Sequence, residues 1–157
     1  MKSVNEWLSA YGRDHKHPVN IKIHKVCVPL ILFSVLSLLW AIPTPEAFNS
    51  LGSFPLNFST LFVFGCLLFY FALDKIFFSI MSVVALVCLT IIYFWAQQDH
   101  FLAANLAIFV LAWIGQFVGH KIEGQKPSFL EDLKFLLIGP LWVLKDLRHS
   151  LKSAVEI

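Results

Sequence analysis

Four runs of apolar residues dominate this chain, over residues 26–42, 58–73, 76–96 and 101–119. A helix needs about 20 such residues to cross the hydrocarbon core of a bilayer. Only 14% of the residues are charged, whereas soluble domains carry about a quarter. We therefore expect an all-α integral membrane protein. It would form a single membrane domain over residues 1–157 and contain four transmembrane helices.

Polar residues separate the four runs. Pro43 and Pro45 end the first run, and residues 97–100 form a short polar loop between the third and the fourth. Asp74 and Lys75 interrupt an apolar stretch that would be far too long for one crossing. We therefore predict a tight turn at these two residues between two antiparallel helices.

The two ends of the chain differ from its middle. Val4, Trp7, Leu8 and Tyr11 follow the i, i+3, i+4, i+7 spacing of one helix face, which predicts an N-terminal amphipathic helix. The aromatic rings of that face suit the headgroup zone. Residues 129–144 are apolar but carry charges and Gly139-Pro140. They favour a C-terminal interfacial or re-entrant helical hairpin, kinked at that pair.

The basic residues indicate the topology. Five of the 12 precede the first run and six follow the fourth, whereas the loops over 43–57 and 97–100 contain none. By the positive-inside bias, both termini and the Lys75 turn are cytoplasmic. Four crossings satisfy this arrangement. We expect a multi-pass protein of a bacterial inner membrane or of the endoplasmic reticulum.

An even number of crossings puts His24 and His120 on the same membrane face, together with His15 and His17. His100 falls on the opposite face. The three cysteines lie in apolar runs and form no CxxC pair, so we expect buried small side chains rather than disulfides or a zinc knuckle. The net charge of +2 does not suggest nucleic-acid binding.

Polar side chains gather where the fourth run ends. Gln116, His120 and Glu123 fall at i, i+4 and i+7 and so share one helix face. Polar groups that deep in apolar sequence are costly and usually functional. A histidine cluster alone does not name a metal, because imidazole suits zinc, iron, copper and nickel. The residues also allow histidines that only cap helices or bind headgroups, a Gln116 that only packs helices together, and a Glu123 that pairs with a lysine or orients His120.

Two motifs together resemble a known family. The first is His15-x-x-Pro18-x-Asn20-x-x-x-His24-x-x-x-x-Pro29, and the second is Trp113-x-x-Gln116-Phe117-x-Gly119-His120-x-x-Glu123-x-x-x-Pro127. The pair, followed by Ile138-Gly139-Pro140, is similar to the 2-hydroxy fatty acid dioxygenases. That small membrane family includes a fungal enzyme of the endoplasmic reticulum that acts in phytosphingosine breakdown. The resemblance covers nearly the whole chain.

The resemblance implies an Fe(II)-dependent α-oxidation. A 2-hydroxy fatty acid from the membrane would react with O₂ and leave a fatty acid one carbon shorter. The catalytic metal ligands would be His15, His24 and His120, with His17 as a further candidate where relatives carry asparagine. Asn20, Gln116 and Glu123 would support the ligands or contact the substrate. Lys16, Lys22 or Lys121 would attract its carboxylate to the interface.

The sequence also allows two other functions. It does not indicate the oligomeric state. The first is a zinc-dependent membrane lipid hydrolase in which Glu123 is the general base, although the chain has no H-E-x-x-H motif. The second is a non-catalytic lipid-binding scaffold. Turnover without oxygen would favour the hydrolase, and histidine substitutions without effect would favour the scaffold.

Overall fold

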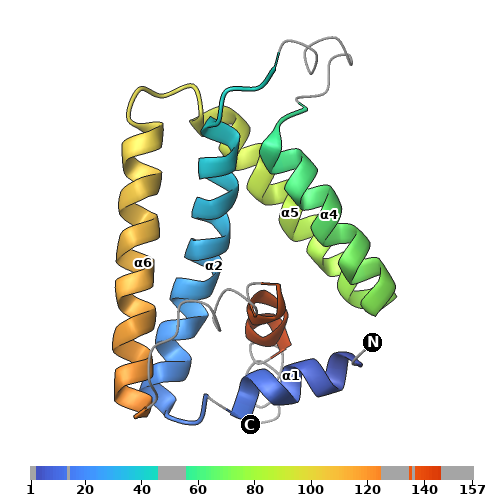
Figure 1. Cartoon of the computed structure of the whole chain (residues 1–157), viewed down its shortest axis with the longest axis vertical. Helices are drawn as coiled ribbons and strands as arrows, with labels where there is room; N and C mark the ends of the chain where they lie inside the picture. The colour runs from blue at the N-terminus through green and yellow to red at the C-terminus, as the bar shows by residue number, and fades with distance from the viewer. Residues whose placement is uncertain (1–2, 14, 46–55, 125–134, 136, 146–157) are drawn as a thin grey trace, which may run out of the picture. The chain divides into compact units, whose positions relative to one another are not determined.

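The computed structural model describes residues 3–13, 15–45, 56–124, 135 and 137–145, apart from the side chain of Arg13. These residues form the helices α1 (Val4–Arg13), α2 (Pro18–Ala41), α4 (Phe58–Leu73), α5 (Lys75–Trp95) and α6 (Phe101–Glu123), shown in Figure 1. Residues 138–145 are also helical. The described residues contain no strand, which confirms the prediction of an all-α protein.

Three of the described helices are long and apolar enough to cross a membrane, over Pro18–Trp40, Lys75–Trp95 and Phe101–Glu123. Helix α4 is apolar but has 16 residues. At about 1.5 Å per residue it rises roughly 24 Å, which is short of a hydrocarbon core of about 30 Å. Four crossings therefore stay a prediction.

Helix α2 begins eight residues before the first apolar run, at Pro18. Proline suits the first helical position because its missing N–H has no partner there in any helix. The next amide, of Val19, donates to Nδ1 of His17 (3.3 Å), and the carbonyl of His17 accepts from Ile21. Asn20 and His24 thus lie on the same rigid helix as the first apolar run.

The chain divides into two compact units. The first comprises Met1–Leu32 with Leu111–Ile157, and the second comprises Phe33–Val110. The second unit contains α4, α5 and parts of α2 and α6. Its core joins Leu36, Val63, Ile92 and Phe101 with partly buried neighbours such as Trp95.

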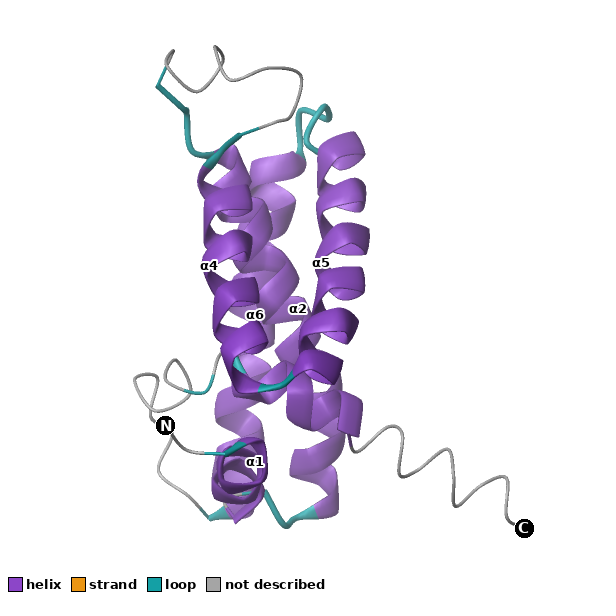
Figure 2. Cartoon of the chain, turned by 90° about the vertical axis from the view of Figure 1, so that its right-hand side faces the viewer, coloured by secondary structure: helices purple, strands orange, loops and turns teal. Residues whose placement is uncertain are grey.

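The predicted turn at Asp74 is confirmed. Helix α4 ends at Leu73 and α5 begins at Lys75, and the two helices lie side by side (Figure 2). Asp74 caps both helices. Its amide donates to the carbonyl of Tyr70, and its carboxylate accepts from the amides of Ile76 (2.8 Å) and Phe77 (3.0 Å). One extended residue therefore completes the reversal.

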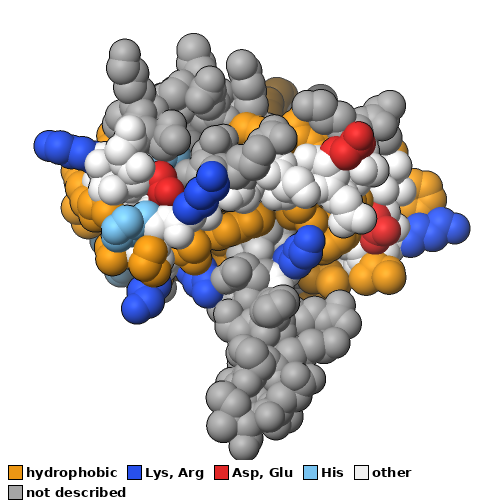
Figure 3. Space-filling model, turned by 90° about the horizontal axis from the view of Figure 1, so that it is seen from below, with side chains coloured by type: hydrophobic (Ala, Val, Ile, Leu, Met, Phe, Trp, Pro, Cys, Tyr) orange, Lys and Arg blue, Asp and Glu red, His pale blue; other side chains and the backbone are white. Residues whose placement is uncertain are grey.

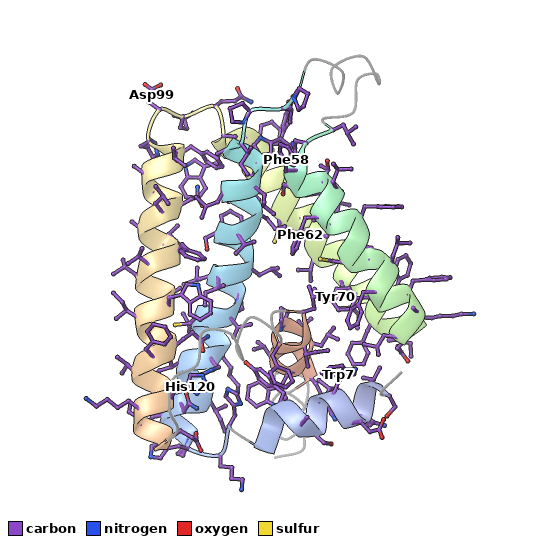
Figure 4. The ribbon with its side chains drawn as sticks, viewed as in Figure 1. Trp7, Phe58, Phe62, Tyr70, Asp99 and His120 are labelled. Atoms are coloured by element: carbon purple, nitrogen blue, oxygen red, sulfur yellow. The ribbon has the colours of Figure 1, made fainter. Side chains whose placement is uncertain are left out.

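The first unit packs α1 and residues 138–145 around parts of α2 and α6. The amphipathic helix predicted at the N-terminus is α1, and its apolar face is buried at Leu8 and Tyr11. Trp7 packs edge-on against Phe135, with ring centroids 6.1 Å apart (Figure 4 labels Trp7). Gly139 and Pro140 lie in the first turn of helix 138–145. The part of the predicted C-terminal hairpin that precedes residue 135 lies outside the described residues.

Candidate metal centre

Two glycines allow α6 to approach α2 closely. A Cβ added at Gly115 would lie 2.6 Å from Sγ of Cys27, and one at Gly119 would collide with Oδ1 of Asn20. The glycines are four residues apart, so they share one face of α6. Small residues at this spacing let membrane helices pack backbone to backbone. The close packing brings the end of α6 beside the start of α2.

His24 lies on the α2 side of this contact and is fully buried, with no exposed surface. Its Nδ1 lies 3.1 Å from the carbonyl oxygen of Asn20. Because a carbonyl only accepts, Nδ1 carries the proton, and Nε2 of the neutral ring carries the lone pair. Nε2 is buried and has no hydrogen-bond partner among the residues that the structure describes. A buried lone pair without a donor fits a metal ligand.

His15 follows α1 and is held in the same way. Its Nδ1 donates to the carbonyl of Tyr11 (2.7 Å), and its ring stacks on the Tyr11 ring with centroids 4.3 Å apart. The side chain is 6% exposed. This bond again leaves the lone pair on Nε2. A backbone carbonyl that fixes the tautomer is the usual support of a metal-binding histidine.

His120 completes the group from the last turn of α6, where it points towards α2 (Figure 4). Its ring centroid is 5.0 Å from that of His24 and 5.5 Å from that of His15, and the His15 and His24 centroids are 4.3 Å apart. One nitrogen from each ring lies within 4.8 Å of the others. The structure thus brings together three buried imidazoles from three segments, which fits one shared ion.

Glu123 links the same three segments. Its Oε1 accepts from the amides of Lys16 (2.9 Å) and His17 (3.0 Å), and its Oε2 accepts from the amide of His17 and from Nδ2 of Asn20 (2.9 Å each). The carboxylate therefore lies at the N-terminus of α2, where a helix dipole favours negative charge. Through these hydrogen bonds, Glu123 fixes the end of α6 to the start of α2 and to the residues that follow His15.

Replacement of Glu123 by glutamine should loosen this arrangement. Both carboxylate oxygens accept from N–H groups, whereas an amide offers one acceptor and turns a donor towards the other amides. We expect the free energy of unfolding to fall by about 1–2 kcal/mol, and metal affinity to fall about tenfold. Thermal unfolding and a metal titration in detergent measure both.

Glu6 provides the matched control. Its carboxylate also accepts a backbone amide, that of Ser3, but within the first turn of α1. Glu6→Gln should leave metal affinity unchanged. Equal metal affinities for Glu123→Gln and the unmodified protein would contradict the positioning role.

The other predicted site residues fall in different places. Asn20 is fully buried, and its carbonyl supports His24. Gln116 is 3% exposed and lies one turn before His120. His17 is exposed and outside the histidine group, with Nδ1 used by the amide of Val19. His100 lies in the second unit, where its Nε2 accepts from Nε1 of Trp95 (3.5 Å).

Gly115 and Gly119 are functional residues that were not predicted from the sequence, although the G-x-x-x-G spacing is typical of closely packed membrane helices. Tyr11 was predicted as a ring for the headgroup zone, whereas it is 5% exposed and supports His15 by both stacking and its carbonyl. The sequence does not predict that contact, because every residue has a backbone carbonyl and the residue type does not show which one accepts a hydrogen bond.

Comparison with known proteins identifies the family of this chain. Residues 1–151 match the family described as Mpo1-like, 2-hydroxy-palmitic acid dioxygenase Mpo1-like. The chain is 27% identical over 146 residues to the 2-hydroxy-palmitic acid dioxygenase MPO1 of Saccharomyces cerevisiae. The aligned region covers 92% of this chain and 79% of the yeast protein. No solved structure matches the chain. On the match across nearly its whole length, the chain belongs to the Mpo1-like family.

Proposed function

We propose that this protein is an Fe(II)-dependent dioxygenase that cleaves 2-hydroxy fatty acids with O₂ to the fatty acid one carbon shorter. The observation that carries the proposal is the group of three buried imidazoles, His15, His24 and His120. The family and the yeast relative, whose name states a 2-hydroxy-palmitic acid dioxygenase, support the reaction class.

The three histidines would hold the ion through neutral nitrogens. A non-haem Fe(II) with few protein ligands supplies open positions for a substrate and O₂. The carbonyl of Tyr11 keeps the ring proton of His15 on Nδ1, and the carbonyl of Asn20 does the same for His24. The Nε2 lone pairs of both rings would then bind the shared ion. Glu123 keeps the three segments at fixed separation.

The substrate would enter from the bilayer with its carboxylate towards water. Lys16, Lys22 and Lys121 are exposed near the histidines in sequence, and Figure 3 shows basic side chains that project from a face where histidine also reaches the surface. These cations attract the carboxylate. The acyl tail would remain among apolar side chains, so the substrate need not leave the membrane.

We further propose that α4 supplies a fourth crossing and that both termini are cytoplasmic, in a bacterial inner membrane or the endoplasmic reticulum. The distribution of basic residues supports this topology. The alternative zinc hydrolase needs Glu123 as a base. Both carboxylate oxygens of Glu123 instead accept hydrogen bonds, from the amides of Lys16 and His17 and from Nδ2 of Asn20. These bonds make Glu123 unfavourable as a general base.

Purified protein, loaded with Fe(II) under anaerobic conditions, provides the test. We expect about one iron per chain, O₂ uptake that depends on 2-hydroxypalmitate, and a 15-carbon fatty acid by mass spectrometry. Palmitate should cause no uptake. Turnover without oxygen, or with zinc alone, would overturn the proposal in favour of a hydrolase.

A further inference from the structure

A small cavity of about 20 Å³ lies in the first unit beside the histidine group. Its lining includes Tyr11, Val28 and Gln116. Each of these lies four positions from one of the histidines, namely His15, His24 and His120. On α2 and α6 four residues are about one turn. The cavity therefore adjoins the candidate metal position one turn further into the apolar segments.

The lining is mostly apolar, with Ile31, Phe135 and Gly139 among its residues. Gln116 contributes the one amide side chain, beside the hydroxyl-bearing ring of Tyr11 and the indole of Trp113. Its side chain is 3% exposed, and Nε2 has no hydrogen-bond partner among the described residues. An amide donor buried without a partner carries a large desolvation penalty. A ligand atom that accepts a hydrogen bond would remove that penalty.

The size and character of the cavity restrict that ligand atom. A volume of about 20 Å³ has room for a small group such as one hydroxyl or one water molecule. An apolar wall disfavours a charged oxygen, since burial of an unpaired carboxylate is far more costly than burial of a neutral hydroxyl. A neutral hydroxyl oxygen meets both conditions.

The order of groups along the substrate matches the order along the helices. The exposed Lys22 and Lys121 flank His24 and His120 on the polar side, whereas Gln116 lies on the apolar side. A 2-hydroxy fatty acid presents its carboxylate, then the hydroxyl-bearing carbon, then its tail. We infer that Gln116 selects the substrate by its 2-hydroxyl group, with Nε2 donating a hydrogen bond to the hydroxyl oxygen in this cavity. This inference rests on the proposed function for the identity of the substrate.

The test is equilibrium binding of radiolabelled 2-hydroxypalmitate and palmitate to the full chain in detergent after the metal is chelated. Without metal, the preference for the hydroxylated acid reports on the cavity rather than on chelation. We expect the unmodified protein to prefer 2-hydroxypalmitate. Gln116→Leu should reduce that preference about tenfold, as expected for one lost hydrogen bond, while palmitate binding stays within twofold.

Gln116→Met keeps the side-chain length without the donor and serves as the second variant if the leucine variant does not fold by circular dichroism. Gln97→Leu, at an exposed glutamine between α5 and α6, is the matched control and should keep the preference. The inference would be overturned if the unmodified protein bound the two acids equally well. It would also be overturned if a Gln116 variant bound both acids as the unmodified protein does, or bound both more weakly by the same factor. Metal content, measured separately, reports on the proposed function, so the two can fail independently.

Discussion

Replacement of His120 by alanine should abolish iron binding and substrate-dependent O₂ uptake. The variant keeps His15 and His24, but two imidazoles bind the ion more weakly than three. The space left by the His120 ring would adjoin the buried rings of His15 and His24. We expect iron per chain to fall from about one to below one tenth, which is a loss of affinity beyond 100-fold. Elemental analysis after gel filtration and an oxygen electrode measure both quantities.

His100→Ala is the matched control for this substitution. His100 is an exposed histidine whose Nε2 accepts from Trp95, and it lies outside the histidine group. Its iron content and activity should equal those of the unmodified protein. A His120→Ala variant that folds, as judged by circular dichroism, and retains its iron would exclude His120 as a ligand.

Gly119→Ala should destabilise the protein through a single added methyl group. The new Cβ would collide with Oδ1 of Asn20. That side chain cannot move aside easily, because it is fully buried and its Nδ2 donates to Glu123. Overpacking of this kind costs about 1–3 kcal/mol. Any shift of Asn20 also displaces the carbonyl that orients His24, so iron affinity should fall at least tenfold.

Gly65→Ala tests the same chemical change where space is open. A Cβ at Gly65, within α4, would meet no heavy atom within 4 Å apart from the adjacent residues and the backbone of its own helix. We expect no loss of thermal stability or of iron. Differential thermal unfolding of the two variants in one detergent makes the comparison. Equal thermal stability and iron content of both variants would show that the α2–α6 contact has room for a methyl group at Gly119.

Much of the candidate site was predictable because it follows from helix geometry and charge distribution. The spacing of Gln116 and His120 predicted a shared helix face, and the basic residues predicted four crossings, which would put His24 and His120 on one membrane face. The structure brings the two histidines together, whereas the four crossings stay a prediction. Both arguments need only residue types and positions. The position of Asp74 between two apolar runs predicted the turn for the same reason.

The rest depended on contacts between segments that residue types do not encode. Glu123 was expected near His120 or a lysine, but its oxygens accept from the amides of Lys16 and His17. Any residue except proline offers such an amide, so no side chain signals the partner. His17 was a further candidate ligand, at a position where relatives carry asparagine, but its Nδ1 accepts from the amide of Val19 at the start of α2. Helix α4, in contrast, has the bounds of the predicted apolar run, Phe58–Leu73, and the side chain of Asn57 caps its start.

The distribution of the three histidines over the chain has a consequence for biosynthesis. His15 and His24 emerge early from the ribosome, whereas His120 follows only after α4 and α5 have been made. The ion therefore cannot bind all three rings until α6 has been made. A nascent or truncated chain that stops before α6 would carry His15 and His24 without the third imidazole, so loading with iron would distinguish chains that contain α6 from shorter products.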